Sequence, residues 1–347
     1  FRECAELINF VPTVRSARAG CWSVVAVVLS LAVFMPSARG NFFNATDAAI
    51  GTSTFASGSP ALADYNNDGL LDVGAGYHIM RNNGPDGTGQ TTLTNIGGIP
   101  QNGNAVFGDY DKDGFVDYFM SSYGRLYHNN GGNNFTLAQQ FTGMPTKGRA
   151  SAFVDINGDS YLDLYVGAFE ACVVGCYQPD VIYLNNQDGT FSDVTQAAGL
   201  EKPGKGLGIS WADYDNDQDL DVFVANDLMQ DFLFRNEGNG TFTEVSMLVG
   251  VAFNEDGQPL NGMGTSFGDY NNDGNLDLVV TNFQDQPNVL FHNEGNGFFT
   301  DLSYSCCIGA KILIYLSWGV DFFDYDNDGH LDMMTVSYTH LTLPTKA

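Results

Sequence analysis

The chain has 347 residues, and 44% of them are hydrophobic, enough to build a large core. Its 41 acidic residues outnumber its 14 lysines and arginines and give a formal net charge of −27. Such a charge repels phosphate backbones and anionic lipids, so nucleic acid and anionic membrane surfaces are disfavoured as partners.

Residues 1–40 are expected to be an N-terminal extension that contains a signal peptide. Two arginines precede an apolar run from Cys21 to Met35, and Ala38 and Gly40 then offer a small-x-small cleavage site. The alternative is a membrane anchor, but the run is shorter than the roughly 20 apolar residues that a spanning helix needs. We therefore expect a secreted protein, extracellular, periplasmic or at the cell surface, with no membrane insertion after cleavage.

A nine-residue phrase with Asp or Asn at positions 1, 3 and 5 and Asp at position 9 then occurs six times. The copies, loops 1 to 6, hold more than half of the acidic residues. Ca²⁺ takes about six to eight oxygen ligands, which alternate side chains and one backbone carbonyl of a tight turn can supply. The phrase therefore predicts up to six calcium sites, about one per loop, with position 7 contributing its carbonyl. The predicted ligands are Asp64, Asn66, Asp68, Leu70 and Asp72 in loop 1; Asp109, Asp111, Asp113, Phe115 and Asp117 in loop 2; Asp155, Asn157, Asp159, Tyr161 and Asp163 in loop 3; Asp213, Asp215, Asp217, Asp219 and Asp221 in loop 4; Asp269, Asn271, Asp273, Asn275 and Asp277 in loop 5; and Asp324, Asp326, Asp328, His330 and Asp332 in loop 6.

The alternative is that Asp, Asn and Gly in these loops are only turn formers. Six copies that keep Asp at position 9 argue against it, because a metal-free hairpin has no reason to gather carboxylates that repel one another. Position 6, where a sharp turn favours φ > 0, is Gly in four loops but Ser160 in loop 3 and Gln218 in loop 4. We expect those two loops to be strained or to bind calcium more weakly.

The sequence around the loops predicts strands. Each loop follows an apolar residue two positions before its first Asp and precedes a short apolar or β-branched stretch, so each should join two strands of a hairpin. The first aspartates stand at 64, 109, 155, 213, 269 and 324, a period of about 45 to 58 residues. This period is typical of the blades of a β-propeller.

A second phrase recurs between the loops, as in Leu233-Phe-Arg-Asn-Glu-Gly-Asn-Gly-Thr-Phe-Thr-Glu-Val-Ser246. It predicts a strand, an Asn/Gly turn and another strand, so each repeat has four strands. The predicted fold class is all-β, a β-propeller of four-stranded blades with Asp-rich calcium loops. Two Gly-x-Gly stretches, Gly206–Gly208 and Gly262–Gly264, stand at the same offset before a loop and are interpreted as close strand packing near the propeller axis.

The two phrases in fixed order resemble the FG-GAP/VCBS repeats of integrin-α-type propellers, and within that group the cartilage acidic protein and ASPIC/UnbV type. The resemblance covers about residues 41–336. It implies a secreted, calcium-stabilised propeller, usually of seven blades, that serves adhesion or recognition. The six loops of this chain would then belong to about seven blades in the intact protein.

The expected segments are therefore 1–40, the propeller at 41–336, and an irregular tail at 337–347 that continues neither phrase. A non-native end of the sequence and a divergent terminus are the two alternatives for this tail.

Cys172 and Cys176 flank a short loop and are expected either to form a local disulfide or to remain thiols; the pairing of the adjacent Cys306 and Cys307 is left open.

No nucleophile elbow, His-Glu-x-x-His motif, phosphate loop or dinucleotide fingerprint occurs, so no enzyme is expected. The histidines are dispersed, and three of them stand at hairpin positions where exposure is expected; the five are His78, His128, His292, His330 and His340.

The main hypothesis is a recognition or adhesion module for an extracellular protein or glycan. The alternative is an extracellular carbohydrate-active enzyme, a polysaccharide lyase or hydrolase, with Arg125, Lys147, Arg149, Arg235 and residues 201–208 as its candidates.

Overall fold

The computed structural model describes residues 8–10, 61–75, 78–87, 91–98, 104–145, 148–169, 177–306, 308, 313 and 316–338. The expected signal peptide lies outside them apart from residues 8–10, and so do Cys172, Cys176, Cys307, Lys147 and His340.

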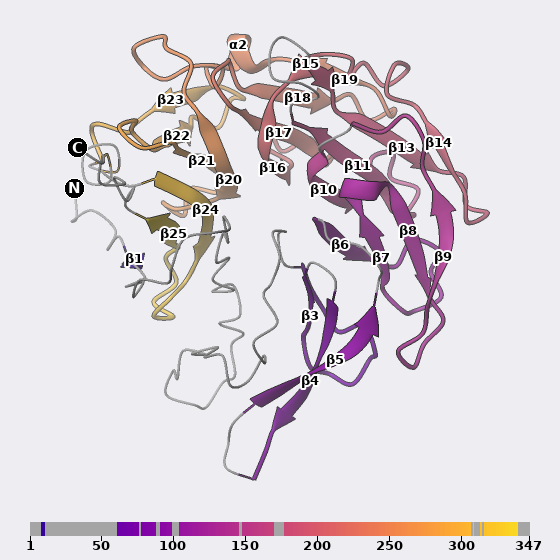
Figure 1. Cartoon of the computed structure of the whole chain (residues 1–347). Coiled ribbons are helices and arrows are strands. Elements are labelled where there is room, and N and C mark those ends of the chain that lie inside the picture. Colours follow the sequence, from indigo (N-terminus) through magenta and orange to yellow (C-terminus); the bar gives the residue numbers. More distant parts are fainter. Residues whose placement is uncertain are drawn as a thin grey trace, which may run out of the picture.

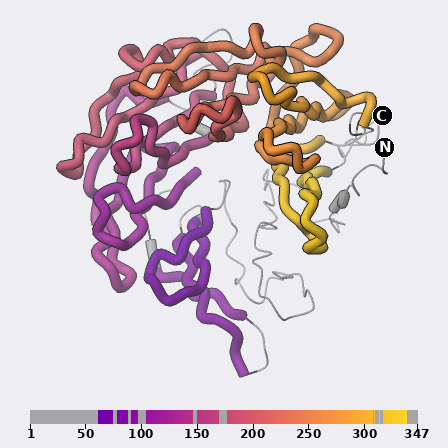
Figure 2. The backbone as a smooth tube through the Cα atoms, turned by 180° about the vertical axis from the view of Figure 1, so that it is seen from behind, coloured from indigo at the N-terminus to yellow at the C-terminus, as the bar shows by residue number. Residues whose placement is uncertain are grey.

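Five four-stranded antiparallel sheets follow one another along the chain, each with its strands in sequence order. Figure 1 shows that these blades succeed one another around an arc, and the view from behind in Figure 2 shows the same order. Blade 1 has β2 (Ala61–Ala63), β3 (Asp72–Ala75), β4 (His78–Pro85) and β5 (Thr91–Gly98); blade 2 has β6 (Ala105–Gly108), β7 (Asp117–Met120), β8 (Arg125–Asn129) and β9 (Phe135–Gln140); blade 3 has β10 (Gly148–Val154), β11 (Asp163–Ala168), β13 (Val181–Asn185) and β14 (Phe191–Asp193); blade 4 has β16 (Gly206–Ala212), β17 (Asp221–Asn226), β18 (Phe232–Asn236) and β19 (Phe242–Glu244); blade 5 has β20 (Gly262–Gly268), β21 (Asp277–Asn282), β22 (Val289–Asn293) and β23 (Phe299–Asp301). The predicted β-propeller of four-stranded blades is confirmed.

A sixth sheet contains β24 (Leu316–Phe323), β25 (Asp332–Tyr338) and β1 (Ile8–Phe10). β24 and β25 are the antiparallel hairpin around loop 6, and β1 pairs with β25 in parallel. β25 runs to Tyr338, so the last strand extends two residues past the expected propeller boundary at 336.

Short elements lie in the connections at one end of the propeller. The 3₁₀ turn η1 (Ser121–Tyr123) and the strand β12 (Gln178–Pro179) lie between the second and third strands of a blade. The strand β15 (Pro203–Gly204), which pairs with β12, and the helix α2 (Ser246–Val249) lie between one blade and the next. No helix among the described residues has the length and apolar character to cross a membrane.

The hydrophobic core lies between the blades. Phe223 of blade 4, for example, packs in one buried cluster with Leu278 and Phe291 of blade 5. Equivalent clusters join blades 1 and 2, blades 2 and 3, blades 3 and 4, and blades 5 and 6. Since one fully buried Phe or Leu side chain contributes about 1.5 to 3 kcal/mol, these layers hold neighbouring blades together.

The innermost strands of blades 4, 5 and 6 lie against one another, β16 beside β20 and β20 beside β24. A Cβ atom at Gly208 would lie 2.9 Å from the Cα of Gly264, and one at Gly264 would collide with the carbonyl oxygen of Trp318. The predicted role of the Gly-x-Gly stretches in close packing near the axis is thereby confirmed.

Candidate metal centres

Each of the six acidic loops connects the first strand of its blade to the second, as predicted. The position-9 aspartate is in every case the first residue of the second strand; these are Asp72, Asp117, Asp163, Asp221, Asp277 and Asp332. All six loops therefore lie at the same end of the propeller.

Every loop folds around the carboxylate at position 1. In loop 4, Oδ1 of Asp213 accepts the backbone N–H of Asp217 at 2.9 Å, and Oδ2 accepts the N–H of Gln218 at 2.9 Å. The position-5 carboxylate in turn accepts the backbone N–H of position 7. In loop 4, Oδ1 of Asp217 accepts the N–H of Asp219 at 2.9 Å. The other five loops make the same bonds. In loop 4 each of these three oxygens accepts one backbone bond and has a second lone pair left for a cation.

The backbone conformation explains two sequence preferences. Positions 4 and 6 have positive φ in every loop, for example 62° at Asn216 and 78° at Gln218. Asn and Gly adopt this conformation most readily, which accounts for the Asn that stands at position 4 in four of the loops. Ser160, at 69°, and Gln218 adopt it as well, so the expected strain in loops 3 and 4 has a structural basis.

In loops 1 to 5 the position-9 carboxylate is buried and held by two backbone amides. Oδ2 of Asp221 accepts the N–H of Tyr214 at 3.2 Å, and Oδ1 accepts the N–H of Asn236, at the end of β18, at 2.8 Å. Loops 1, 2, 3 and 5 repeat both bonds. The direction of this carboxylate is therefore fixed before any cation binds.

Positions 1, 3 and 9 converge in the three loops that have Asp at position 3. One carboxylate oxygen from each of the three side chains lies within 4.8 Å of the other two in the sets Asp109, Asp111 and Asp117; Asp213, Asp215 and Asp221; and Asp324, Asp326 and Asp332. Among the described residues, no position-5 aspartate belongs to these three sets. Asp113 forms a separate group with Asp111 and His128. In loops 1, 3 and 5 an Asn amide takes the position-3 place.

Burial, together with repulsion from neighbouring aspartates, raises the pKa of four of these carboxyl groups, those of Asp111, Asp117, Asp215 and Asp221. Burial, reinforced by neighbouring aspartates, raises the pKa of Asp221 to about 8 and that of Asp117 to about 7. Burial, followed by the charges of Asp217 and Asp213, also raises the pKa of Asp215. A bound cation would relieve this cost.

The donor set fits Ca²⁺. Within the converging set of loop 4, Oδ1 of Asp215 is a buried atom with no hydrogen-bond partner among the described residues. A hard cation that prefers carboxylate and amide oxygens would satisfy it.

Two histidines differ from expectation. His330 is exposed as expected, but the side chains of His128 and His292 are 26% and 22% exposed and lie against the loops. Each stands one residue before the buried Asn of the third strand, Asn129 or Asn293, so its side chain faces the position-9 aspartate. The position just before this Asn in the second phrase is the sequence signal that could have predicted where the two histidines lie.

Three of the basic residues suggested for an enzyme have local partners. Arg125 donates to Gln140 at 2.8 Å, Arg235 pairs with Glu237 at 2.9 Å, and Lys202 pairs with Glu244. None of these contacts joins one candidate basic residue to another.

Comparisons with known proteins identify the repeats. The family model for FG-GAP-like repeats matches residues 169–224, 213–280 and 269–335, and the second and third matches begin at the first Asp of loops 4 and 5. Cartilage acidic protein 1 of Mus musculus is 28% identical over 196 residues, covering 54% of this chain and 29% of that protein. The Homo sapiens protein is 30% identical over 197 residues, covering 54% and 28%. The chain thus spans less than a third of the length of these curated relatives.

Among solved structures, an Agrocybe aegerita lectin that recognises non-reducing terminal N-acetylglucosamine has a TM-score of 0.48 at 19% identity. The alignment covers 79% of this chain and 73% of that one.

Proposed function

Since the chain carries FG-GAP-like repeats over residues 169–335, we propose that it is a calcium-binding recognition module that acts outside the cell on a protein or glycan partner. The observation that carries the proposal is the convergence of carboxylates at positions 1, 3 and 9 in repeated loops at one end of a propeller.

Calcium has a structural role in this proposal. The side chains at positions 1, 3, 5 and 9 would hold it in each loop, and bound Ca²⁺ supplies the positive charge that the crowded carboxylates lack. Because the folded loop binds the ion and the unfolded chain does not, calcium stabilises each blade by mass action. The loops are short and exposed, which suits the affinity of roughly 10⁻⁴ to 10⁻³ M typical of extracellular calcium modules. Similarity to cartilage acidic protein 1 and the expected signal peptide support the same location.

The recognition surface would lie at the end of the propeller opposite the calcium loops. There, the connections from the second to the third strand of blades 2 to 5 carry exposed apolar side chains: Tyr123, Tyr177, Leu228 and Phe283. Aromatic and aliphatic groups that a rigid scaffold presents on loops are typical contact residues for proteins and sugars.

The test is binding to a glycan array and to a panel of extracellular proteins, with millimolar Ca²⁺ and with excess chelator. We expect calcium-dependent binding that falls at least tenfold in Tyr177→Ala or Leu228→Ala. Phe298→Ala is the matched control, because Phe298 is as exposed as Tyr177, at 47% against 46%, but lies in a turn at the calcium end. Binding that survives chelation unchanged, or that is lost only in the control, would contradict the proposal.

A further inference from the structure

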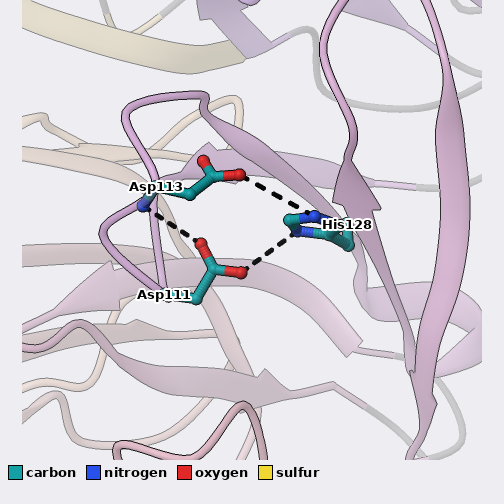
Figure 3. Close-up of side chains that lie close together, drawn as sticks. All are labelled: Asp111, Asp113 and His128. Atoms are coloured by element: carbon teal, nitrogen blue, oxygen red, sulfur yellow. Dashed lines mark hydrogen bonds and ion pairs between the residues drawn. The ribbon is translucent and has the colours of Figure 1, made fainter.

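Among the described residues, loop 2 differs from the other loops because one imidazole nitrogen faces two of its carboxylates. Nδ1 of His128, on β8, lies 3.1 Å from Oδ2 of Asp111 and 3.2 Å from Oδ1 of Asp117, while Nε2 lies 3.8 Å from Oδ2 of Asp113. Figure 3 shows the ring facing both Asp111 and Asp113. The site therefore offers a nitrogen donor in addition to oxygens.

The state of Nδ1 points to a ligand. The atom is buried and makes no hydrogen bond of acceptable geometry in the described part of the chain, although two carboxylate oxygens face it. At metal–ligand bonds of about 2.0 to 2.2 Å, neighbouring ligand atoms lie roughly 2.9 to 3.5 Å apart. The separations from Nδ1 to Asp111 and to Asp117 fall within this range.

The surroundings of the ring also fit metal coordination. The backbone N–H groups of Tyr110 and Asn129 hold the Asp117 carboxylate in place at 3.2 and 2.8 Å. Asp113 lies on the Nε2 side, where the proton of a ligating imidazole is usually accepted by a carboxylate.

The equivalent position in the other blades lacks this arrangement. It is Leu184 in blade 3, and Arg235 in blade 4 pairs with Glu237. In blade 5, Nδ1 of His292 makes a 2.9 Å hydrogen bond to Asp277, and position 3 of that loop is Asn271. In the described part of the chain, loop 2 thus combines four aspartates with an imidazole whose Nδ1 makes no hydrogen bond.

We propose that loop 2 is a selective site for a divalent transition-metal ion, held by Nδ1 of His128 with Asp111 and Asp117 and oriented by Asp113. Ca²⁺ prefers oxygen ligands, whereas imidazole favours ions such as Zn²⁺ and Co²⁺. The inference rests on the proposed function to the extent that the loops are metal sites, and it assigns loop 2 a different ion from its neighbours.

The experiment titrates the full chain with Co²⁺, and then with Zn²⁺ in competition, in millimolar Ca²⁺. The visible absorption of Co²⁺ reports its coordination, and the His128 variants then test for the nitrogen ligand. We expect one Co²⁺ site that Zn²⁺ displaces, weakened at least tenfold in His128→Leu, which copies blade 3, and in His128→Gln, which keeps a polar side chain. His292→Leu is the matched control and should retain the site.

Equal Co²⁺ and Zn²⁺ binding in the wild type and both His128 variants would overturn the proposal, as would loss of the site in His292→Leu alone. Melting of each variant with and without Ca²⁺ verifies folding and tests the calcium proposal separately. A calcium-dependent melt without any Co²⁺ site would leave the proposed function standing and remove this inference.

Discussion

The side-chain amide of Asn236 donates a hydrogen bond of 2.9 Å to the backbone carbonyl of Ile156, 80 residues earlier and in the preceding blade. Three other blades repeat the contact: Asn129 with Tyr65, Asn185 with Tyr110, and Asn293 with Tyr214. The acceptor is always position 2 of a loop, and the donor is the Asn whose own backbone amide binds a position-9 carboxylate. One residue therefore joins the loop of its own blade to the loop of the blade before.

We expect Asn236→Ala to lower the free energy of unfolding by about 1 to 3 kcal/mol, because it leaves a buried carbonyl without a partner. Asn82→Ala is the control, since Asn82 makes the bond within its blade, to Leu71 at 3.1 Å, but no inter-blade bond is found for it among the described residues. Urea denaturation of both variants should give the larger loss for Asn236. Equal losses would show that the inter-blade bond contributes nothing.

Asp213→Ala or Asp217→Ala should destabilise the protein more in millimolar Ca²⁺ than in chelator. Both variants lose backbone hydrogen bonds in either condition, but only the calcium-bound protein also loses a ligand. Thermal melts in both conditions measure the difference, with Asp256→Ala as an exposed aspartate outside the loops. Equal melting shifts with and without calcium would refute a ligand role for these residues.

Gln218→Gly and Ser160→Gly should each stabilise the protein by about 1 kcal/mol, because both residues hold positive φ where Gly carries no steric cost. Asn216→Gly, at a φ of 62° that Asn tolerates, should gain less. Chemical denaturation compares the three. A loss of stability in both Gly variants would mean that their side chains make contacts worth more than the strain.

The metal-free protein should become less stable as pH rises from 5 to 8. Burial raises the pKa of Asp72 and Asp163 to about 6, of Asp117 to about 7 and of Asp221 to about 8, from an unfolded value of 3.8. Groups with a raised folded pKa contribute stability that is complete below the unfolded pKa and lost as pH rises through the folded one.

Calcium should flatten or reverse this pH dependence, because the ion binds the deprotonated carboxylates and competes with their protons. Urea denaturation between pH 5 and pH 8, on metal-stripped and calcium-loaded protein, tests both statements. A metal-stripped protein that gains stability from pH 5 to pH 8 would contradict this account of the buried carboxyls.

The loops, their hairpins and the four strands per blade could be predicted from the sequence because each is a local pattern that recurs at one period. Asn236 appears there only as a turn residue, since nothing local marks a partner 80 positions away. His128 was expected to be exposed because it follows an aromatic residue at a hairpin position; only the three-dimensional structure shows that its ring lies against Asp111. The pairing of β1 with β25 could not be predicted either, because it joins distant segments that share no repeat phrase.

The most direct test of the central claim is a thermal melt of the chain in millimolar Ca²⁺ and in excess chelator, with calorimetric titration to count the sites. We predict a large calcium-dependent rise in melting temperature and five or six bound calcium ions. When a transition metal fills loop 2, the number of bound calcium ions should be one fewer. An unchanged melting temperature with no measurable calcium binding would show that the aspartates serve only as turn formers.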